Sequence, residues 1–154
     1  MSAITSNSTA GANTTFDFDF PADRLMDCSK STVKESEYGA GTFATCDIKA
    51  GEVVEYGVAR VLTNIDGNEN PYIFTWSDEV PNTTWATCSG TAMFYNTVKE
   101  DGSENTKMYR YFDKNRFVIV ATKDVRCGDE LTHVYKSKQW RKCFSDLRED
   151  ACPN

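Results

Sequence analysis

The stretch Ala121-Thr122-Lys123-Asp124-Val125-Arg126-Cys127-Gly128-Asp129-Glu130-Leu131-Thr132-His133-Val134-Tyr135 guides the interpretation of the whole chain. It begins at the end of an apolar run, passes through polar residues and reaches a glycine, which allows the backbone angles of a tight corner. A short run containing further apolar residues then ends at Tyr135. We therefore expect a strand, a corner at Gly128 and a second short strand that brings Tyr135 to a defined place.

An earlier part of the chain repeats this corner. Residues 44–52 read Ala-Thr-Cys-Asp-Ile-Lys-Ala-Gly-Glu, and they align position by position with residues 121–129, Ala-Thr-Lys-Asp-Val-Arg-Cys-Gly-Asp. Each copy places an aspartate, an aliphatic residue and a glycine at the same spacing. Two copies of one corner predict two similar β units, of which only the second ends in a tyrosine.

The rest of the chain is also rich in β patterns. Short apolar or alternating runs are separated by Gly, Asn and Asp, which is typical of strands and tight turns. Residues 77–90 are polar and irregular, with Trp85 isolated among them, and Asp113-Lys114-Asn115 fits a hairpin turn. The predicted strands cover 42–46, 53–56, 59–62, 72–76, 108–112 and 116–121, with corners at Gly51 and near Gly57.

The two ends of the chain differ from this β pattern. Residues 1–15 contain little that could be buried, which favours a disordered arm. Phe16, Phe18 and Phe20 alternate with aspartates, and this pattern fits either a short edge strand or an aromatic anchor for the arm. After Tyr135, the residues Trp140, Phe144 and Leu147 are spaced as on one face of a helix over 136–148.

The composition limits the class of protein. A chain of 154 residues fits one domain of ordinary size. Its net charge of −6 and its lack of Lys/Arg clusters argue against a nucleic-acid binder and favour a basic partner. No apolar run is long enough to span a membrane and no signal peptide is apparent, so we expect a protein that is not secreted and is nuclear or cytoplasmic. A homodimer is compatible with these totals.

The cysteines leave a second reading of the chain open. The six cysteines contain no C-x-x-C pair, so a metal site is not predicted. Free thiols are expected inside cells, whereas six cysteines and three Asn-x-Ser/Thr sequons would also suit a small secreted β domain held by disulfides.

Three segments contain residue patterns that suit a functional site. Tyr38-Gly39-Ala40-Gly41-Thr42-Phe43-Ala44 is a Gly-x-Gly segment before a strand, where a ligand can approach the main chain closely. Met93-Phe94-Tyr95-Asn96-Thr97 ends an apolar run in an amide, and Gly128–Tyr135 is followed by Trp140. Each segment alone is common as a turn, a cap or a packing contact.

Together, in this order and spacing, the three segments resemble the SET domain of protein lysine methyltransferases, in particular a minimal, virus-like SET core. The resemblance covers roughly residues 33–140 and implies a mostly β, β-clip-like fold of short sheets with a knot-like C-terminal threading and a C-terminal helix. It gives a disordered arm over 1–18, a SET domain over 19–142 and a C-terminal extension over 143–154.

The resemblance also implies a cofactor, a substrate and the residues of a site. S-adenosylmethionine would methylate a lysine of a basic protein such as a histone tail, with Tyr135 as the catalytic residue beside the reacting groups. Trp140 would cover the adenine. The cofactor would be held by Gly39, Ala40, Gly41, Tyr95, Asn96, Thr97, Tyr135 and Trp140, and the lysine channel would be lined by Tyr72, Trp76 and His133.

Three departures from the family pattern matter for activity. The family's Asn-His-Ser is Asn96-Thr97-Val98 here, so the histidine that braces the threading is replaced by threonine. The Cys-x-Cys zinc module after many SET cores is absent from this sequence. His133 stands where many members carry the Phe or Tyr that limits the number of methyl groups added. A SET-like module that binds without catalysis therefore remains the alternative function.

Overall fold

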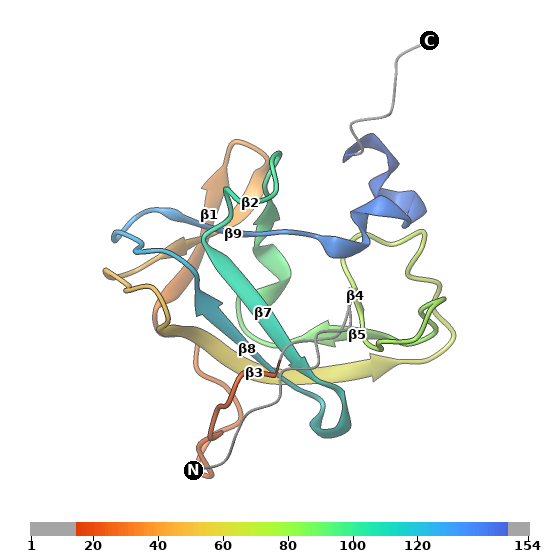
Figure 1. Ribbon diagram of the computed structural model, residues 1–154, viewed down its shortest axis with the longest axis horizontal. Coiled ribbons are helices and arrows are strands. Elements are labelled where there is room, and N and C mark those ends of the chain that lie inside the picture. Colours follow the sequence, from red (N-terminus) through yellow and green to blue (C-terminus); the bar gives the residue numbers. More distant parts are fainter. Residues whose placement is uncertain (1–14, 148–154) are drawn as a thin grey trace, which may run out of the picture.

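We describe residues 15–147 of a computed structural model, which fold into two small β-sheets joined by loops (Figure 1). The sheets have the strand orders β1-β2-β9-β6 and β4-β5-β3-β8-β7. The mostly β fold predicted from the sequence is confirmed. Residues 1–14 of the arm predicted over 1–18 lie outside the described residues. The same is true of residues 148–154 of the predicted C-terminal extension. The elements are β1 Ser31–Ser36, β2 Gly39–Ala44, β3 Val53–Leu62, β4 Phe74–Thr75, β5 Trp85–Cys88, η1 Ala92–Phe94, β6 Asn96–Thr97, β7 Thr106–Tyr111, η2 Phe112–Lys114, β8 Arg116–Ala121, β9 Glu130–His133, η3 Lys136–Gln139 and η4 Lys142–Leu147.

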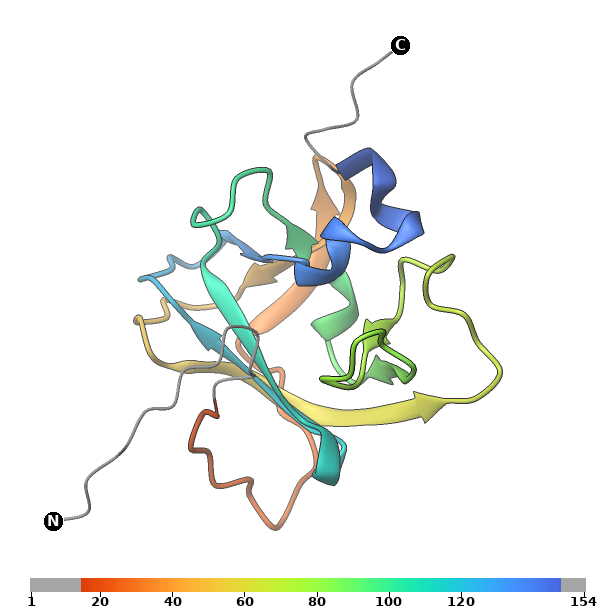
Figure 2. The ribbon, with the colours of Figure 1, turned by 45° about the vertical axis from the view of Figure 1, so that its right-hand side comes forward.

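The long strand β3 crosses the molecule and pairs with β8 along one part and with β5 along another (Figures 1 and 2). A corner near Gly57 was predicted, but the strand continues through this residue. A Cβ at Gly57 would lie 2.1 Å from Ser89 Oγ and 2.8 Å from the Phe117 ring, so the glycine serves close packing instead of a turn.

The irregular segment predicted for residues 77–90 is wrong at its end. Residues 85–88 form β5, which pairs with β3 from Ala59↔Cys88 to Leu62↔Trp85. Their sequence, Trp-Ala-Thr-Cys, has no clear alternation because three of the four side chains are buried. Trp85 is therefore a core residue, and the predicted strand over 72–76 shortens to β4.

The two repeated corners pair with each other about an approximate twofold axis. Ile48 and Val125 exchange both main-chain hydrogen bonds, each of 2.8 Å. Several further bonds have a counterpart in the other copy, and Gly51 and Gly128 have φ angles of 88° and 89°. The equivalent bonds are Gly51 N to Ala121 O and Gly128 N to Ala44 O, and Ala50 N to Asp124 Oδ1 and Cys127 N to Asp47 Oδ1.

The second corner leads into β9, which pairs in parallel with β6 at Asn96↔Thr132 and Thr97↔His133. Two distant segments of the chain thus lie side by side. The knot-like threading that the resemblance implies stays a prediction. The predicted C-terminal helix is present as two short 3₁₀ helices, η3 and η4, in which Phe144 is buried while Trp140, between them, and Leu147 are exposed.

The aromatic residues that precede β1 pack on the outer face of the five-stranded sheet. Phe18 lies 5.3 Å from the ring of Tyr56, and Phe20 lies 5.3 Å from that of Tyr111. Phe16 contacts Tyr109 in the same cluster. These residues form no strand, so the anchor is the reading that the structure supports.

Candidate functional site

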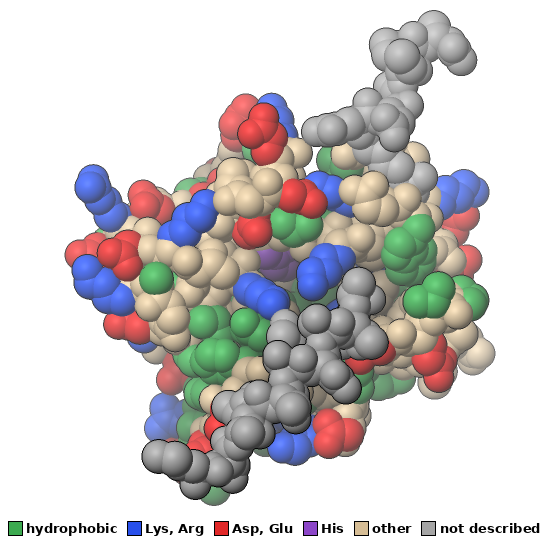
Figure 3. Space-filling model, in the orientation of Figure 1, with side chains coloured by type: hydrophobic (Ala, Val, Ile, Leu, Met, Phe, Trp, Pro, Cys, Tyr) green, Lys and Arg blue, Asp and Glu red, His purple; other side chains and the backbone are tan. Residues whose placement is uncertain are grey.

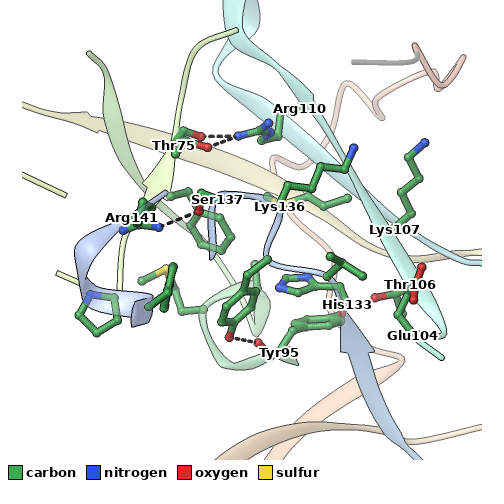
Figure 4. Close-up of a pocket in the computed structure, with 18 of the residues that line it drawn as sticks. Thr75, Tyr95, Glu104, Thr106, Lys107, Arg110, His133, Lys136, Ser137 and Arg141 are labelled. Atoms are coloured by element: carbon green, nitrogen blue, oxygen red, sulfur yellow. Dashed lines mark hydrogen bonds between the residues drawn. The ribbon is translucent and has the colours of Figure 1, made fainter. Parts of the chain in front are cut away.

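A cavity of about 460 Å³ lies where β7, the end of β9, η1 and the C-terminal segment meet (Figure 4). Four of the predicted site residues line it: Tyr72, Tyr95, His133 and Tyr135. They come from three separate parts of the sequence, and the pairing of β6 with β9 brings two of those parts together. The rest of the wall includes Ile73, Phe74, Met93, Thr106, Met108, Val134 and Phe144.

Tyr135 is held at both its main chain and its hydroxyl group. The hydroxyl donates a short hydrogen bond to the main-chain carbonyl of Tyr95, shown as a dashed line in Figure 4. Phe144 packs against the ring at 5.2 Å between centroids. Burial raises the pKa of the Tyr135 phenol to about 12, so the group stays protonated near neutral pH and acts through its oxygen and its proton as a hydrogen-bonding group.

His133 is buried between the two tyrosines. Its ring is stacked on Tyr95 at 5.5 Å and meets Tyr135 edge-on at 5.0 Å. Burial lowers the pKa of this imidazole to about 4, because the charged form would lose its hydration. The ring is therefore neutral near pH 7 and shapes the cavity as an aromatic side chain.

Thr97 supplies a brace at the position where the family has histidine. Its hydroxyl accepts a 3.1 Å hydrogen bond from the main-chain N–H of Tyr135. The N–H of Val98 also donates to the carbonyl of His133 at 3.2 Å. The Asn-Thr-Val sequence thus keeps β6 bonded to the segment that carries the tyrosine.

Asn105 is a positioning residue that the sequence analysis missed. Its amide donates to the carbonyl of Glu130 at 2.9 Å and accepts the N–H of Thr132 at 2.8 Å, so it bonds to the backbone of β9 as a strand would. Thr106 adds a hydrogen bond to the carbonyl of Thr132. An amide just before a predicted strand was the only available signal, and such residues are common in turns.

The Gly-x-Gly segment lies against Asn96 and Glu130. The Asn96 amide group donates to Glu130 Oε1 at 2.8 Å and to the carbonyl of Ala40 at 3.3 Å. A Cβ at Gly41 would stand 2.6 Å from that carboxylate oxygen, so a larger residue would clash with the Glu130 side chain. Ala40, Asn96 and Glu130 therefore form a polar surface with two acceptor oxygens, beside the cavity but outside its wall.

Three aromatic residues predicted for the site have different surroundings. Tyr72 lies at the cavity and is 74% exposed, as a residue at an entrance would be. Trp76 is buried in the core, where its Nε1 donates to Asn115 and its ring meets Phe112 edge-on. Trp140 is half-exposed and lies near Trp85. Neither Trp76 nor Trp140 lines the cavity.

Arg141 connects the C-terminal segment to the loop that carries Tyr72. Its buried guanidinium donates to three main-chain carbonyls, those of Gly67, Asn70 and Ile73. The same group stacks over the rings of Trp85 and Phe144. This contact fixes one wall of the cavity relative to Tyr135.

Basic side chains border the cavity. This cluster was not predicted from the sequence, because its members are scattered along the chain. Lys107, Arg110 and Lys136 all line it, and Figure 4 shows them on the side opposite Tyr95 and His133. In Figure 3, Lys and Arg side chains border the hollow in which the purple histidine is visible.

Within residues 15–147 we find neither a helix suited to crossing a membrane nor a group of three or more side chains that could hold a metal ion. The cysteines of this part of the chain, at 28, 46, 88, 127 and 143, are all free thiols. The reading as a disulfide-stapled domain gains no support from these residues.

The chain matches the model of one protein family and several solved structures. The model of the SET domain family matches residues 39–136. Among solved structures, a Plasmodium falciparum protein described as a histone methyltransferase matches with a TM-score of 0.56 at 19% identity, covering 72% of this chain and 96% of that chain. No curated protein sequence gives a significant match.

Two structures of an active polycomb repressive complex 2 are also similar in fold. The stimulated-state structure matches with a TM-score of 0.52 at 22% identity, and the match covers 70% of this chain and 15% of that chain. For the basal state the TM-score is 0.53 at 21% identity, with 78% and 16% covered. The match therefore corresponds to a small part of each of those two chains.

Proposed function

Because this chain belongs to the SET domain family, we propose that it transfers the methyl group of S-adenosylmethionine to the side-chain amine of a protein lysine. The observation that carries this proposal is the position of Tyr135. Its hydroxyl group is fixed against the carbonyl of Tyr95 inside a cavity, and its main chain is bonded to Thr97. A rigidly held, protonated phenol in a partly closed cavity suits the alignment of a nucleophile.

The residues beside the cavity fit the amino-acid end of the proposed cofactor. An ammonium group needs acceptor oxygens, and the Glu130 carboxylate and the Ala40 carbonyl both lie within hydrogen-bond distance of the Asn96 amide. The absence of a Cβ at Gly41 lets the Glu130 carboxylate and the Asn96 amide pack closely against the main chain of this segment. S-adenosylmethionine would supply an activated methyl group on a positively charged sulfur. We propose that Trp140 covers its adenine.

The cavity residues favour the neutral form of the substrate amine. Lysine attacks only as the neutral amine, and with an ordinary pKa near 10.4 its deprotonation at pH 7 costs about 4.6 kcal/mol. Ile73, Phe74 and Met108 are apolar parts of the wall, and an apolar wall disfavours the ammonium ion. The Tyr135 oxygen can then accept a hydrogen bond from the amine and hold it in line with the methyl group.

His133 is proposed to limit how many methyl groups are added. It is neutral, buried and stacked between Tyr95 and Tyr135, so its ring restricts the space next to the reacting amine. A base role is not favoured, because its pKa of about 4 makes it a weak proton acceptor at neutral pH.

The proposed substrate is a basic protein such as a histone tail, in the nucleus or cytoplasm. The net charge of −6 supports this, because an acidic protein attracts a basic partner over a distance. The alternative of a module that binds without catalysis depended on the loss of the bracing histidine. The bond between Thr97 and Tyr135 weakens that argument.

The experiment that tests this function replaces the phenol. Tyr135→Phe should abolish methyl transfer to a histone mixture, while calorimetry shows S-adenosylmethionine binding within a few fold of wild type. Tyr56→Phe, on the outer face of the sheet, is the matched control and should keep full turnover. Unchanged turnover in Tyr135→Phe would refute the assignment, and cofactor binding without turnover in the wild type would favour the binding module.

A further inference from the structure

The border of the cavity has a charge opposite to that of the whole chain. Lys107, Arg110 and Lys136 line the cavity, although the net charge of the protein is −6. They come from β7 and from the residue after Tyr135. A substrate lysine that reaches Tyr135 through this cavity must place its neighbouring residues close to these cations.

Two of these basic side chains lie over aromatic rings that are two residues further along the chain. Lys107 Nζ lies 4.8 Å from the ring centroid of Tyr109, and the Arg110 guanidinium lies 5.2 Å from that of Phe112. Arg110 also donates to the carbonyl and hydroxyl of Thr75, at the opposite wall. Their positions are therefore set by the fold.

Lys136 is close enough to the other two for their charges to act on it. Its pKa is lowered by partial burial and by the positive charges of Lys107 and Arg110. Three like charges gathered at one opening create a field that a nearby carboxylate relieves and a further cation worsens.

The acidic residues of the same wall have partners of their own. Asp101 forms an ion pair of 2.7 Å with Lys138, and Glu104 accepts a hydrogen bond from the N–H of Gly102. Asp78 does not line the cavity, but its negative charge raises the pKa of Arg110 against the lowering that burial causes. These groups reduce the positive field, and the cluster of three basic residues at the opening remains.

We propose that the site selects a lysine with an acidic side chain next to it, held by Lys107, Arg110 and Lys136. This inference rests on the proposed function and narrows its substrate class. The negative charge of the whole protein attracts a basic partner over a distance, whereas the local cations choose which lysine of that partner enters. The same cations disfavour the ammonium form of the entering lysine, which assists its reaction.

The test compares three peptides that differ only in the residues beside one lysine, which are glutamate, alanine or arginine. Their binding is measured by fluorescence anisotropy with S-adenosylhomocysteine present, and methyl transfer is measured separately with S-adenosylmethionine. We expect the glutamate peptide to bind about tenfold more tightly than the arginine peptide, with a preference that falls as salt is added.

A charge reversal at the opening should change this preference. Lys136→Glu is expected to remove or invert the order of the glutamate and arginine peptides, and Lys136→Gln to weaken it. Lys114→Glu makes the same change of charge in the exposed turn between β7 and β8 and should keep the wild-type order. Equal or tighter binding of the arginine peptide to the wild-type protein would overturn the inference. Preferential binding of the glutamate peptide without methyl transfer would support the inference and reject the proposed enzyme.

Discussion

At the scale of single residues, the site depends on how a few buried side chains are bonded. Tyr135 is fixed by Thr97 at its main chain and by Tyr95 at its hydroxyl group. His133 has no charge near neutral pH, because its burial removes the water that would hydrate an imidazolium ion and thereby lowers its pKa to about 4. Its burial therefore makes the stability of the protein sensitive to acid.

We predict that the free energy of unfolding decreases as the pH falls from about 6.5 to about 4. In this range the unfolded chain binds a proton on His133, whose ordinary pKa is 6.5, whereas the folded protein does not bind it until about pH 4. Protonation then favours unfolding by up to about 3 kcal/mol at the acid end. Urea denaturation at several pH values measures this loss.

The control for this prediction is His133→Phe, which keeps an aromatic ring and has nothing to titrate. Carboxylates such as the buried Glu55 also titrate on the acid side, and both proteins share them. The difference between wild type and variant therefore isolates His133. Parallel curves for the two proteins between pH 6.5 and 4 would contradict the assignment of a buried, neutral ring.

At the scale of elements, the two matching corners act as one structural unit. Main-chain N–H groups of each copy donate hydrogen bonds to main-chain carbonyl or aspartate oxygens of the other copy. Neither corner therefore has all its hydrogen bonds without the other. Gly51 and Gly128 have nearly the same positive φ, and a Cβ at either position would meet nothing within 4 Å. The cost of an alanine there comes from the backbone angle alone.

We predict that Gly51→Ala and Gly128→Ala destabilise the protein by similar amounts, about 1–2 kcal/mol each. The equality follows from the shared backbone angle and the equivalent hydrogen bonds. Only Gly128 leads directly into β9 and Tyr135, so Gly128→Ala should also have the larger effect on turnover.

Thermal denaturation of the two variants provides the measurement, and Cys127→Ala serves as the control. This cysteine is exposed within the second corner, and its substitution should leave stability within about 0.5 kcal/mol. A cost at one glycine with none at the other would show that the two corners are not energetically equivalent.

At the scale of the whole molecule, two hydrophobic clusters cover the two faces of the five-stranded sheet. The larger core packs against the sheet on the side of the cavity, and the smaller cluster on the outer face contains Tyr56, Val118 and Val120. Phe16, Phe18 and Phe20 complete this second cluster. The chain before β1 is thereby attached to the sheet whose strand β7 lines the site.

We predict that Phe18→Ala lowers the free energy of unfolding by about 1–2 kcal/mol, because the half-buried ring packs against Phe20 and Tyr56. Asp19→Ala, at an exposed neighbouring position, should change it by less than about 0.5 kcal/mol. Urea denaturation of both variants checks the difference. Equal free energies of unfolding for the Phe18→Ala and Asp19→Ala variants would show that the Phe18 ring does not stabilise the fold.

The strands with regular patterns were predictable from local sequence. The hairpin of β7 and β8 was predicted, since residues 108–112 and 116–121 are rich in aromatic and aliphatic residues and flank the short turn at 113–115. The strand β5 was missed because most of its side chains are buried, which removes the alternation that marks an exposed strand. The corner predicted near Gly57 was wrong, because the sequence alone does not distinguish a glycine required for close packing from a glycine required for a turn.

By itself, the sequence determined the β character of the chain, its two matching corners, the family resemblance and the positions of Tyr135, Asn96 and His133 in that pattern. Only the tertiary structure decided that Asn105 holds β9, that Thr97 braces Tyr135 and that Lys107, Arg110 and Lys136 share one opening. The physical reason is the distance along the chain. Local patterns report backbone preference and burial, whereas these contacts join residues that become neighbours only when β6 pairs with β9 and the C-terminal segment closes the cavity.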